Sequence, residues 1–327
     1  MQHDQAADVT LQDDVVEARG LRFHYRAWQP QARARERPTG ARLAEPGEVK
    51  RTPPEAGITA ALPPVLLIHG LASAANIWDL TAPFLARQGF RVVALDQRGH
   101  GASDKPDHGY SFAEIIADDH AVASALGLER PIVVGHSWGG GVVLNYAAAY
   151  PQDVQAIVLV DGGFIQMSHR DDWTREQMLK DLAPPQFAGT PAEVFLTFPR
   201  RGPLAEVWSP QLEDIFLHIV ELREDHTVGP RLSLANHLQI LEAMWDQPTL
   251  ALYDQVSCPI LLVCPEQQAS DDRSRQFQSA KRAGIARILA AHPAVRVEYL
   301  ADTIHDVPLQ RPEALAGLIA QMAAANS

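Results

Sequence analysis

The chain has 327 residues, of which 46% are apolar, and its formal net charge is −12 at pH 7. This length suits one large domain with an insertion, or a domain plus a lid. The acidic charge argues against nucleic acid as a partner, because it would repel a phosphate backbone. We expect no membrane span, since no run of about 18 apolar residues occurs, and no signal peptide, since the first residues are polar and acidic.

The first predicted element is a hairpin over residues 12–28, where two strand-like runs flank Gly20. Residues 30–62 follow and are rich in Pro, Arg, Ala, Glu and Gly, with little apolar content. A segment of this composition cannot bury enough apolar surface to order itself, so we expect an exposed insertion loop there.

From residue 63 onward, short apolar runs alternate with helical patterns. Strands are predicted at 63–70, 90–96, 131–137 and 154–163, and helices at 76–88, 111–127 and 138–150. Asn76 is a possible N-cap of the first helix, while Ser111 and Glu114 form a candidate capping box for the second. Continuous apolar runs of this kind are typical of parallel strands buried on both faces.

Residues 164–250 interrupt the alternation with aromatic residues, prolines and at least two helical patterns. The clearest helix is predicted at 210–223, with Ser209 as its cap and Pro210 at its first position. We interpret this segment as a helical lid inserted into a core formed by residues 1–163 and 251–327. The remaining strands are expected at 258–264 and 295–302, and the remaining helices at 273–291 and 312–325.

The two cysteines, Cys258 and Cys264, fall in one predicted strand. Six residues of extended chain separate them by roughly 20 Å, which is too far for a disulfide. We therefore expect two free thiols in a reduced, cytoplasmic protein and no metal site, because neither cysteine has a partner at ligand spacing.

The strongest chemical signal is Gly135-x-Ser137-x-Gly139, at the junction of a predicted strand and a predicted helix. A sharp strand-to-helix turn of this kind holds its serine in a strained conformation with the hydroxyl exposed. The flanking positions must be small so that strand and helix can approach each other. We therefore predict that Ser137 is a nucleophile.

A serine hydroxyl needs a base, an orienting acid and donors for the developing oxyanion. His305 lies in the loop after the last predicted strand, where the base is expected. The backbone N–H groups of Leu71 and Trp138 are the candidate oxyanion hole. We interpret His69 as structural, and residues 96–103 as a rigid loop stabilised by an Arg–Asp network.

The segments HGLAS, DQRGHGASDKP, GHSWGGG and IHDVPLQRPE together resemble the α/β-hydrolase superfamily, and within it the cofactor-free bacterial esterases and haloperoxidase-like proteins. The resemblance covers about residues 12–325, apart from 30–62. It implies a mostly parallel central sheet flanked by helices, with an inserted helical lid and without a cofactor.

The chain departs from most of these relatives at the acid. Where they carry Asp after the strand that follows the lid, this chain reads Cys-Pro-Glu-Gln-Gln and places Gln268. The alternatives are Asp271 or Asp272, Glu266, or Asp161 at the end of the preceding strand. We favour Asp161, since haloalkane dehalogenases resemble this arrangement and take their acid from that strand.

The leading functional hypothesis is hydrolysis of a carboxylic ester or related acyl compound by a Ser–His–Asp triad. Relatives that are dehalogenases or epoxide hydrolases attack with Asp, where this chain has Ser137. The aromatic residues of the predicted lid indicate an apolar small-molecule substrate, and Phe164, Trp173 and Trp245 are the candidate contacts. Four other reactions use the same triad and stay open, namely C–C bond hydrolysis, lactonase, proline-type aminopeptidase and perhydrolase chemistry. A ligand-binding receptor with little turnover is the alternative outside enzymes.

Overall fold

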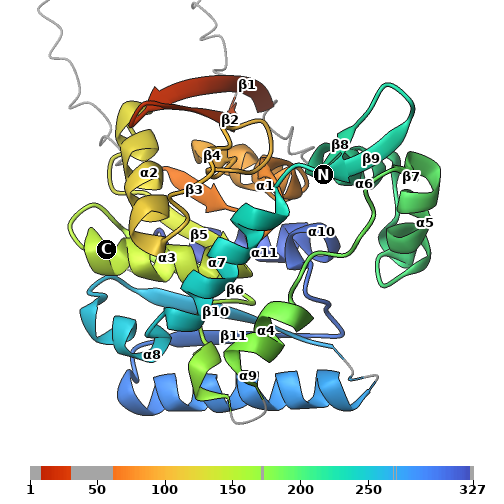
Figure 1. The fold of residues 1–327 in the computed structure, drawn as a ribbon. Coiled ribbons are helices and arrows are strands. Elements are labelled where there is room, and N and C mark those ends of the chain that lie inside the picture. The colour runs from red at the N-terminus through yellow and green to blue at the C-terminus, as the bar shows by residue number, and fades with distance from the viewer. Residues whose placement is uncertain (1–8, 31–61, 171–172, 268, 270, 325–327) are drawn as a thin grey trace, which may run out of the picture.

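The computed structural model describes residues 9–30, 62–170, 173–267, 269 and 271–324 (Figure 1). Its centre is an eight-stranded sheet with the strand order β1-β2-β4-β3-β5-β6-β10-β11. The insertion loop predicted over 30–62 lies, except for its two end residues, outside the described residues. None of the described helices is both long enough and apolar enough to cross a bilayer.

The predicted hairpin is confirmed and forms one edge of the sheet. Strand β1 (Val9–Ala18) pairs antiparallel with β2 (Leu21–Pro30) across a two-residue turn, Arg19-Gly20, in which both residues have positive φ. This geometry suits the right-handed twist of the flanking strands. Strand β2 also pairs antiparallel with β4 and so attaches the hairpin to the rest of the sheet.

The other six strands run parallel to one another, as the alternating pattern predicts. They are β3 (Val65–Ile68), β4 (Val92–Leu95), β5 (Ile132–His136), β6 (Ala156–Val160), β10 (Ile260–Glu266) and β11 (Arg296–Ala301). Strands β3 to β6 are buried along their whole length, which explains their unbroken apolar sequences. Cys258 and Cys264 are both free, as expected.

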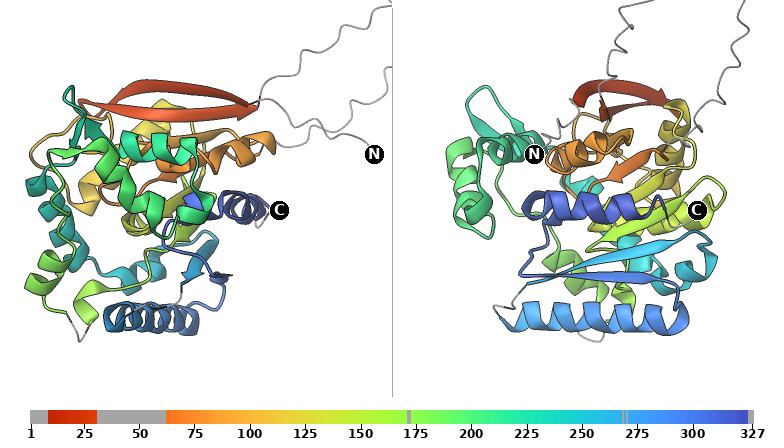
Figure 2. Two further views of the ribbon diagram at one scale, coloured as in Figure 1. Left: turned by 90° about the vertical axis from the view of Figure 1, so that its right-hand side faces the viewer. Right: turned by 180° about the vertical axis from the view of Figure 1, so that it is seen from behind.

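Helices cover both faces of the sheet (Figure 2). On one face, α2 (Phe112–Ala125), α3 (Trp138–Ala149) and α9 (Asp272–Ala291) contribute to a single apolar cluster. On the other face, α1 (Ala82–Arg87), α10 (Val307–Gln310) and α11 (Pro312–Gln321) contribute to a second cluster. The carboxyl ends of the parallel strands lie between these two layers, and all of them point toward the same side of the molecule.

The prediction of one helix over residues 76–88 requires correction. Residues 76–88 form a short 3-10 helix, η1 (Ala75–Trp78), and then α1, because Pro83 is tolerated in a first helical turn but not in the interior of one long helix. Asn76 is not an N-cap, since its side chain donates to Asp79 instead.

The predicted cap of α2 is confirmed, since Ser111 accepts from the backbone N–H of Glu114. The carboxylate of Glu114 pairs with Arg19 at 2.8 Å.

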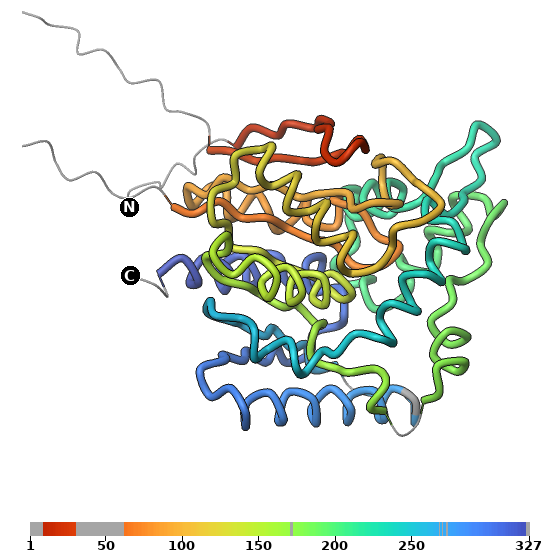
Figure 3. Tube along the Cα trace, turned by 60° about the vertical axis from the view of Figure 1, so that its left-hand side comes forward, coloured from red at the N-terminus to blue at the C-terminus, as the bar shows by residue number. Residues whose placement is uncertain are grey.

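The segment expected to be a helical lid contains both helices and a small sheet. Its strands are β7 (Thr190–Pro191), β8 (Val220–Leu222) and β9 (Thr227–Pro230), in the antiparallel order β7-β9-β8. Its helices are η2 (Met167–His169), α4 (Arg175–Asp181), α5 (Ala192–Arg201), η3 (Ala205–Val207), α6 (Pro210–Ile219), α7 (Leu234–Asp246) and α8 (Thr249–Leu252), followed by η4 (Tyr253–Gln255). Figure 3 follows the chain as it leaves the core after β6 in yellow-green and returns in cyan.

Helix α6 confirms the predicted cap at Ser209 and the predicted first-turn proline, Pro210. It ends at Ile219 rather than at residue 223, because the next residues pair with β9 as a strand. This small sheet was not predicted, since its strands are only two to four residues long and show no clear alternation.

Candidate functional site

Ser137 stands in the turn between β5 and α3, with φ 56° and ψ −121°. This conformation is rare for a residue with a side chain and stores strain at the turn. The small neighbours are required by contact, because a Cβ on Gly135 would lie 2.1 Å from the carbonyl oxygen of Gly139. A Cβ on Gly139 would lie 2.6 Å from the carbonyl oxygen of His69. The strand and the helix therefore meet through glycine backbone on both sides of Ser137.

His305 follows β11, and its Nδ1 lies 2.7 Å from Oδ2 of Asp161 at the end of β6. The Asp161 side chain is 5% exposed, whereas that of His305 is 50% exposed and so remains accessible from the cavity. Ser137, Asp161 and His305 all line one cavity of about 90 Å³. The structure thus brings together the predicted nucleophile, the predicted base and the favoured acid.

The other candidate acids make different contacts. Asp271 is the N-cap of α9 and accepts from the backbone N–H of Ser274 at 2.7 Å. Asp272 pairs with Arg275 on the exposed surface of the same helix, and Glu266 lies 3.6 Å from Arg282. Gln268, which stands at the usual position of the acid, lies outside the described residues.

The electrostatics of the pair favour an ionised acid and a basic histidine. Burial acts to raise the pKa of Asp161, but the hydrogen bond from His305 and the charge of Lys281 outweigh it and hold the pKa below its ordinary value. Desolvation acts to lower the pKa of His305, but the hydrogen bond to Asp161 and its charge raise it above its ordinary value. With Nδ1–H directed at a carboxylate, Nε2 is the ring atom available to accept a proton.

A second histidine supports the loop that carries His305. His136 precedes the nucleophile, and its Nε2–H donates to the backbone carbonyl of His305 at 2.9 Å. Burial lowers the pKa of His136 to about 4, so this ring is neutral near pH 7. His136 was not among the predicted site residues, although its place inside the G-x-S-x-G turn is a signal for such a role.

His69 and the loop over residues 96–103, both interpreted as structural, are held by hydrogen bonds and ion pairs within the core. Buried His69 donates from Nδ1 to its neighbouring carbonyl at 2.7 Å and accepts the backbone N–H of Gln97 at its Nε2. Arg98 pairs with buried Asp118 at 2.6 Å, while Asp96 accepts the backbone N–H of Ala75 in η1 and that of Ala102 in its own loop. The loop over 96–103 is therefore fixed by its own buried charges.

The two candidate oxyanion donors flank the nucleophile. Trp138 is the first residue of α3, where helix N–H groups have no partner within the helix. Leu71 follows β3 next to Gly70, where an added Cβ would lie 3.0 Å from Cβ of Ser137. Within the described residues, neither the Leu71 nor the Trp138 N–H has a backbone or side-chain acceptor.

The residues that line the cavity agree only partly with those expected. Phe164 lines it, but Trp173 and Trp245 do not. Trp173 stacks instead on the guanidinium of Arg170, whose Cζ lies 3.9 Å from the ring centroid. The apolar lining that the sequence analysis missed comes from η2, α7, α9 and the segment after β6, namely Met167, Met244, Phe277 and Ile165.

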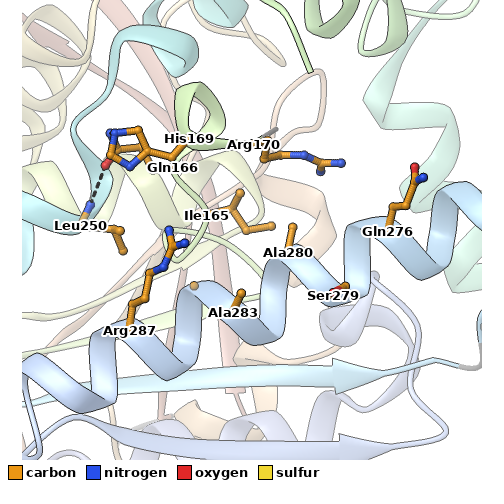
Figure 4. A pocket seen from close by; sticks show the side chains of 11 residues that line it. Ile165, Gln166, His169, Arg170, Leu250, Gln276, Ser279, Ala280, Ala283 and Arg287 are labelled. Atoms are coloured by element: carbon orange, nitrogen blue, oxygen red, sulfur yellow. Dashed lines mark hydrogen bonds between the residues drawn. The ribbon is translucent and has the colours of Figure 1, made fainter. Parts of the chain in front are cut away.

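A larger hollow of about 280 Å³ lies on the other side of Ile165 (Figure 4). It runs between α9, which contributes Gln276 and Arg287, and the segment that holds His169. The side chain of Gln166 accepts the backbone N–H of Leu250 at 3.4 Å and ties this segment to α8. Ser137 and His305 line the smaller cavity and not this hollow.

Residues 63–203 match the family model described as the alpha/beta hydrolase fold. A non-heme haloperoxidase of Rhodococcus erythropolis is 41% identical over 87 residues, which are 27% of this chain and 32% of that protein. A bifunctional esterase/perhydrolase of Acinetobacter calcoaceticus is 41% identical over 91 residues, which are 28% of this chain and 33% of that protein. The chain thus spans about three tenths of the length of the curated relatives it matches.

The likeness in structure is far more extensive than the likeness in sequence. The crystal structure of E-2-(acetamidomethylene)succinate hydrolase superimposes with a TM-score of 0.67 at 19% identity, covering 96% of this chain and 100% of that one. Such a match extends the fold assignment beyond the region of the family model, to both ends of the sheet. The strand order and the strained serine turn agree with this match, and the chain has the α/β-hydrolase fold.

Proposed function

We propose that this protein is a serine hydrolase that cleaves a carboxylic ester or related acyl compound through an acyl-enzyme. The observation that carries the proposal is the 2.7 Å contact between His305 and Asp161 beside Ser137 in one cavity. A serine, a histidine and a buried carboxylate in this relation are the parts that nucleophilic acyl transfer requires.

In the proposed first half-reaction, Nε2 of His305 takes the proton of the Ser137 hydroxyl as Oγ attacks the carbonyl carbon. The carbonyl oxygen becomes an oxyanion and accepts hydrogen bonds from the N–H groups of Leu71 and Trp138. The tetrahedral intermediate then expels the alkoxide, which receives the proton from His305. Asp161 stays ionised and stabilises the imidazolium while it exists.

In the second half-reaction, water enters and His305 takes one of its protons while the oxygen attacks the acyl carbon. The new tetrahedral intermediate breaks its bond to Oγ of Ser137, which recovers a proton from His305. The products are the free acid and the original enzyme, so neither an oxidant nor a cofactor enters the balance.

The cavity supports a short, apolar acyl group. Its volume is about 90 Å³, which leaves space for only a few non-hydrogen atoms, and Phe164, Met167, Met244 and Phe277 supply apolar walls. The esterase/perhydrolase of Acinetobacter calcoaceticus gives independent support for ester chemistry in a relative. We therefore place acetate-sized to butyrate-sized esters within the proposed substrate class.

The direct test compares the wild type with Ser137→Ala on p-nitrophenyl acetate and butyrate. We expect kcat to fall by a factor of about 10⁴ or more, since the variant lacks the atom that forms the acyl-enzyme. Circular dichroism would check that the variant is folded. Equal rates for the two proteins would rule out Ser137 as the nucleophile.

Fluorophosphonate labelling separates this proposal from a binding protein without turnover. A serine activated by His305 is expected to react rapidly and to gain the mass of one phosphonyl group, whereas Ser137→Ala gains none. A wild-type chain that binds acyl compounds yet resists the label would favour the receptor reading instead.

A further inference from the structure

A buried lysine contacts the proposed acid from the side opposite His305. Nζ of Lys281, on α9, lies 2.6 Å from Oδ1 of Asp161, and the lysine side chain is only 11% exposed. Its second contact is the backbone carbonyl of Pro265, at 3.3 Å. The two oxygens of Asp161 thus have separate partners, with Oδ1 on Lys281 and Oδ2 on His305.

The helix that carries Lys281 is fixed against the strand end that carries Asp161. At Gly284, three residues further along α9, an added Cβ would lie 2.0 Å from the carbonyl oxygen of Phe164. Phe164 in turn follows Asp161 by three residues and lines the cavity. Backbone packing therefore holds α9 close to the segment after β6, and the mostly buried side chain of Lys281 spans the remaining distance to Asp161.

Burying an ammonium group is costly unless an anion compensates for it, and an apolar side chain would fill the same space at a lower cost. A lysine at this position therefore indicates a use for its charge. The ionisable groups around it come from every neighbouring element, namely Asp161 after β6, Cys264 and Glu266 on β10, Tyr299 on β11, His305 after β11, and Arg282 on α9.

We propose that Lys281 is a positioning residue of this site, which holds the Asp161 carboxylate through Oδ1 so that Oδ2 stays directed at Nδ1 of His305. The inference rests on the proposed function and adds Lys281 to the pair formed by Asp161 and His305. With both oxygens held, the carboxyl group cannot rotate away, and the orientation of the imidazole toward Ser137 is fixed in turn.

The positive charge has a second effect, on the proton affinity of His305. The positive charge of Lys281 repels the protonated form of His305 and so lowers the pKa of His305. The effect of Asp161, which raises this pKa, is larger. Lys281 also helps to hold the pKa of Asp161 low. Removing its charge should therefore raise the pKa of both groups, and the pH below which His305 loses its role as a base should move upward.

The experiment compares Lys281→Met and Lys281→Gln, which lack the charge, with Lys281→Arg, which keeps it. Arg282→Met is the matched control, since Arg282 is the next residue on α9 and its side chain is 69% exposed. Activity on p-nitrophenyl acetate gives kcat and KM from about pH 5 to 9. Independently of turnover, NMR of ¹⁵N-histidine-labelled protein follows the titration of the His305 ring, assigned by comparison with His305→Asn.

We expect Lys281→Met and Lys281→Gln to lower kcat by about tenfold or more, because the buried ion pair that holds Oδ1 of Asp161 is lost, with a smaller change in KM. Both should raise the pKa of His305 in the NMR titration, while Lys281→Arg restores kcat and pKa toward the wild-type values. Arg282→Met should leave both unchanged. A folded Lys281→Met protein with the wild-type kcat and an unshifted His305 titration would overturn the proposal.

The two proposals can fail separately. A wild-type protein that neither hydrolyses esters nor reacts with a fluorophosphonate would refute the proposed function. The NMR titration would still report whether Lys281 controls His305, because it needs no substrate. Loss of activity in Lys281→Met without any shift of the titration would instead indicate that Lys281 only packs against the strand end.

Discussion

In the proposed mechanism, the 2.7 Å contact between His305 Nδ1 and Asp161 Oδ2 leaves Nε2, the basic nitrogen of the imidazole, free to accept the proton of Ser137. An amide in place of the carboxylate would keep the shape of the side chain but could donate to Nδ1 and so favour the wrong tautomer. We therefore expect Asp161→Asn to lower kcat by about 10⁴-fold. Asp271→Asn is the matched control, because it changes an acid that caps α9. Steady-state kinetics on p-nitrophenyl acetate measures both, and a stronger loss in the control would identify Asp271 as the acid.

Asp161 could be favoured from the sequence for two reasons. The carboxyl ends of adjacent parallel strands lie close together, and haloalkane dehalogenases, which resemble this arrangement, take their acid from that strand. The same reasoning could not find Lys281, whose contact depends on where α9 lies along the sheet. Trp245 was predicted to contact the substrate, whereas its neighbour Met244 lines the cavity. A shift of one residue on a helix turns the side chain by about 100°, and the sequence does not fix that rotation when aromatic and apolar residues are adjacent.

At the scale of elements, the turn from β5 to α3 depends on glycine backbone. We expect Gly135→Ala to destabilise the protein by about 1–3 kcal/mol or more, because its Cβ would lie 2.1 Å from the carbonyl oxygen of Gly139, a contact that only a backbone shift can relieve. The same shift would move Ser137. Thermal and urea unfolding measure the first effect, and the rate of fluorophosphonate labelling measures the second.

The control for this change is Gly317→Ala in α11, where an added Cβ meets nothing within 4 Å. Alanine is favoured over glycine inside a helix, so this variant should be more stable by about 0.5–1 kcal/mol and should label at the wild-type rate. Gly135→Ala with wild-type stability and labelling would show that the turn tolerates a side chain, contrary to the steric argument.

The elements themselves were predictable to different degrees. The buried strands were recognised from unbroken apolar runs, and the caps at Ser111 and Ser209 from short polar signals. The split of residues 76–88 into η1 and α1 depends on Pro83, a signal that was present in the sequence and was not used. The small sheet of β7, β8 and β9 has no comparable signal, since its short strands gain their order from pairing with one another.

At the scale of the whole molecule, the cavity is built from two parts of the chain. The core supplies Ser137, Asp161 and His305 at the ends of its strands, while η2 and α7 of the inserted segment supply Met167 and Met244. Without the inserted segment, the acyl group of the proposed substrate would be exposed to water at the carboxyl ends of the strands. The inserted segment thus supplies apolar walls, and its side chains are expected to set the size of the acyl group.

Met244→Ala tests this division of roles. Removing most of the side chain enlarges a cavity of about 90 Å³ without touching the proposed catalytic groups, so the ratio of kcat/KM for p-nitrophenyl hexanoate to that for acetate should rise about tenfold. Trp245→Ala removes a larger side chain from the next position on α7, but one that does not line the cavity, and should leave the ratio near its wild-type value. If Trp245→Ala changes the ratio and Met244→Ala does not, the acyl group lies on the other side of α7, and the cavity beside Ser137 would have to be assigned to the alcohol.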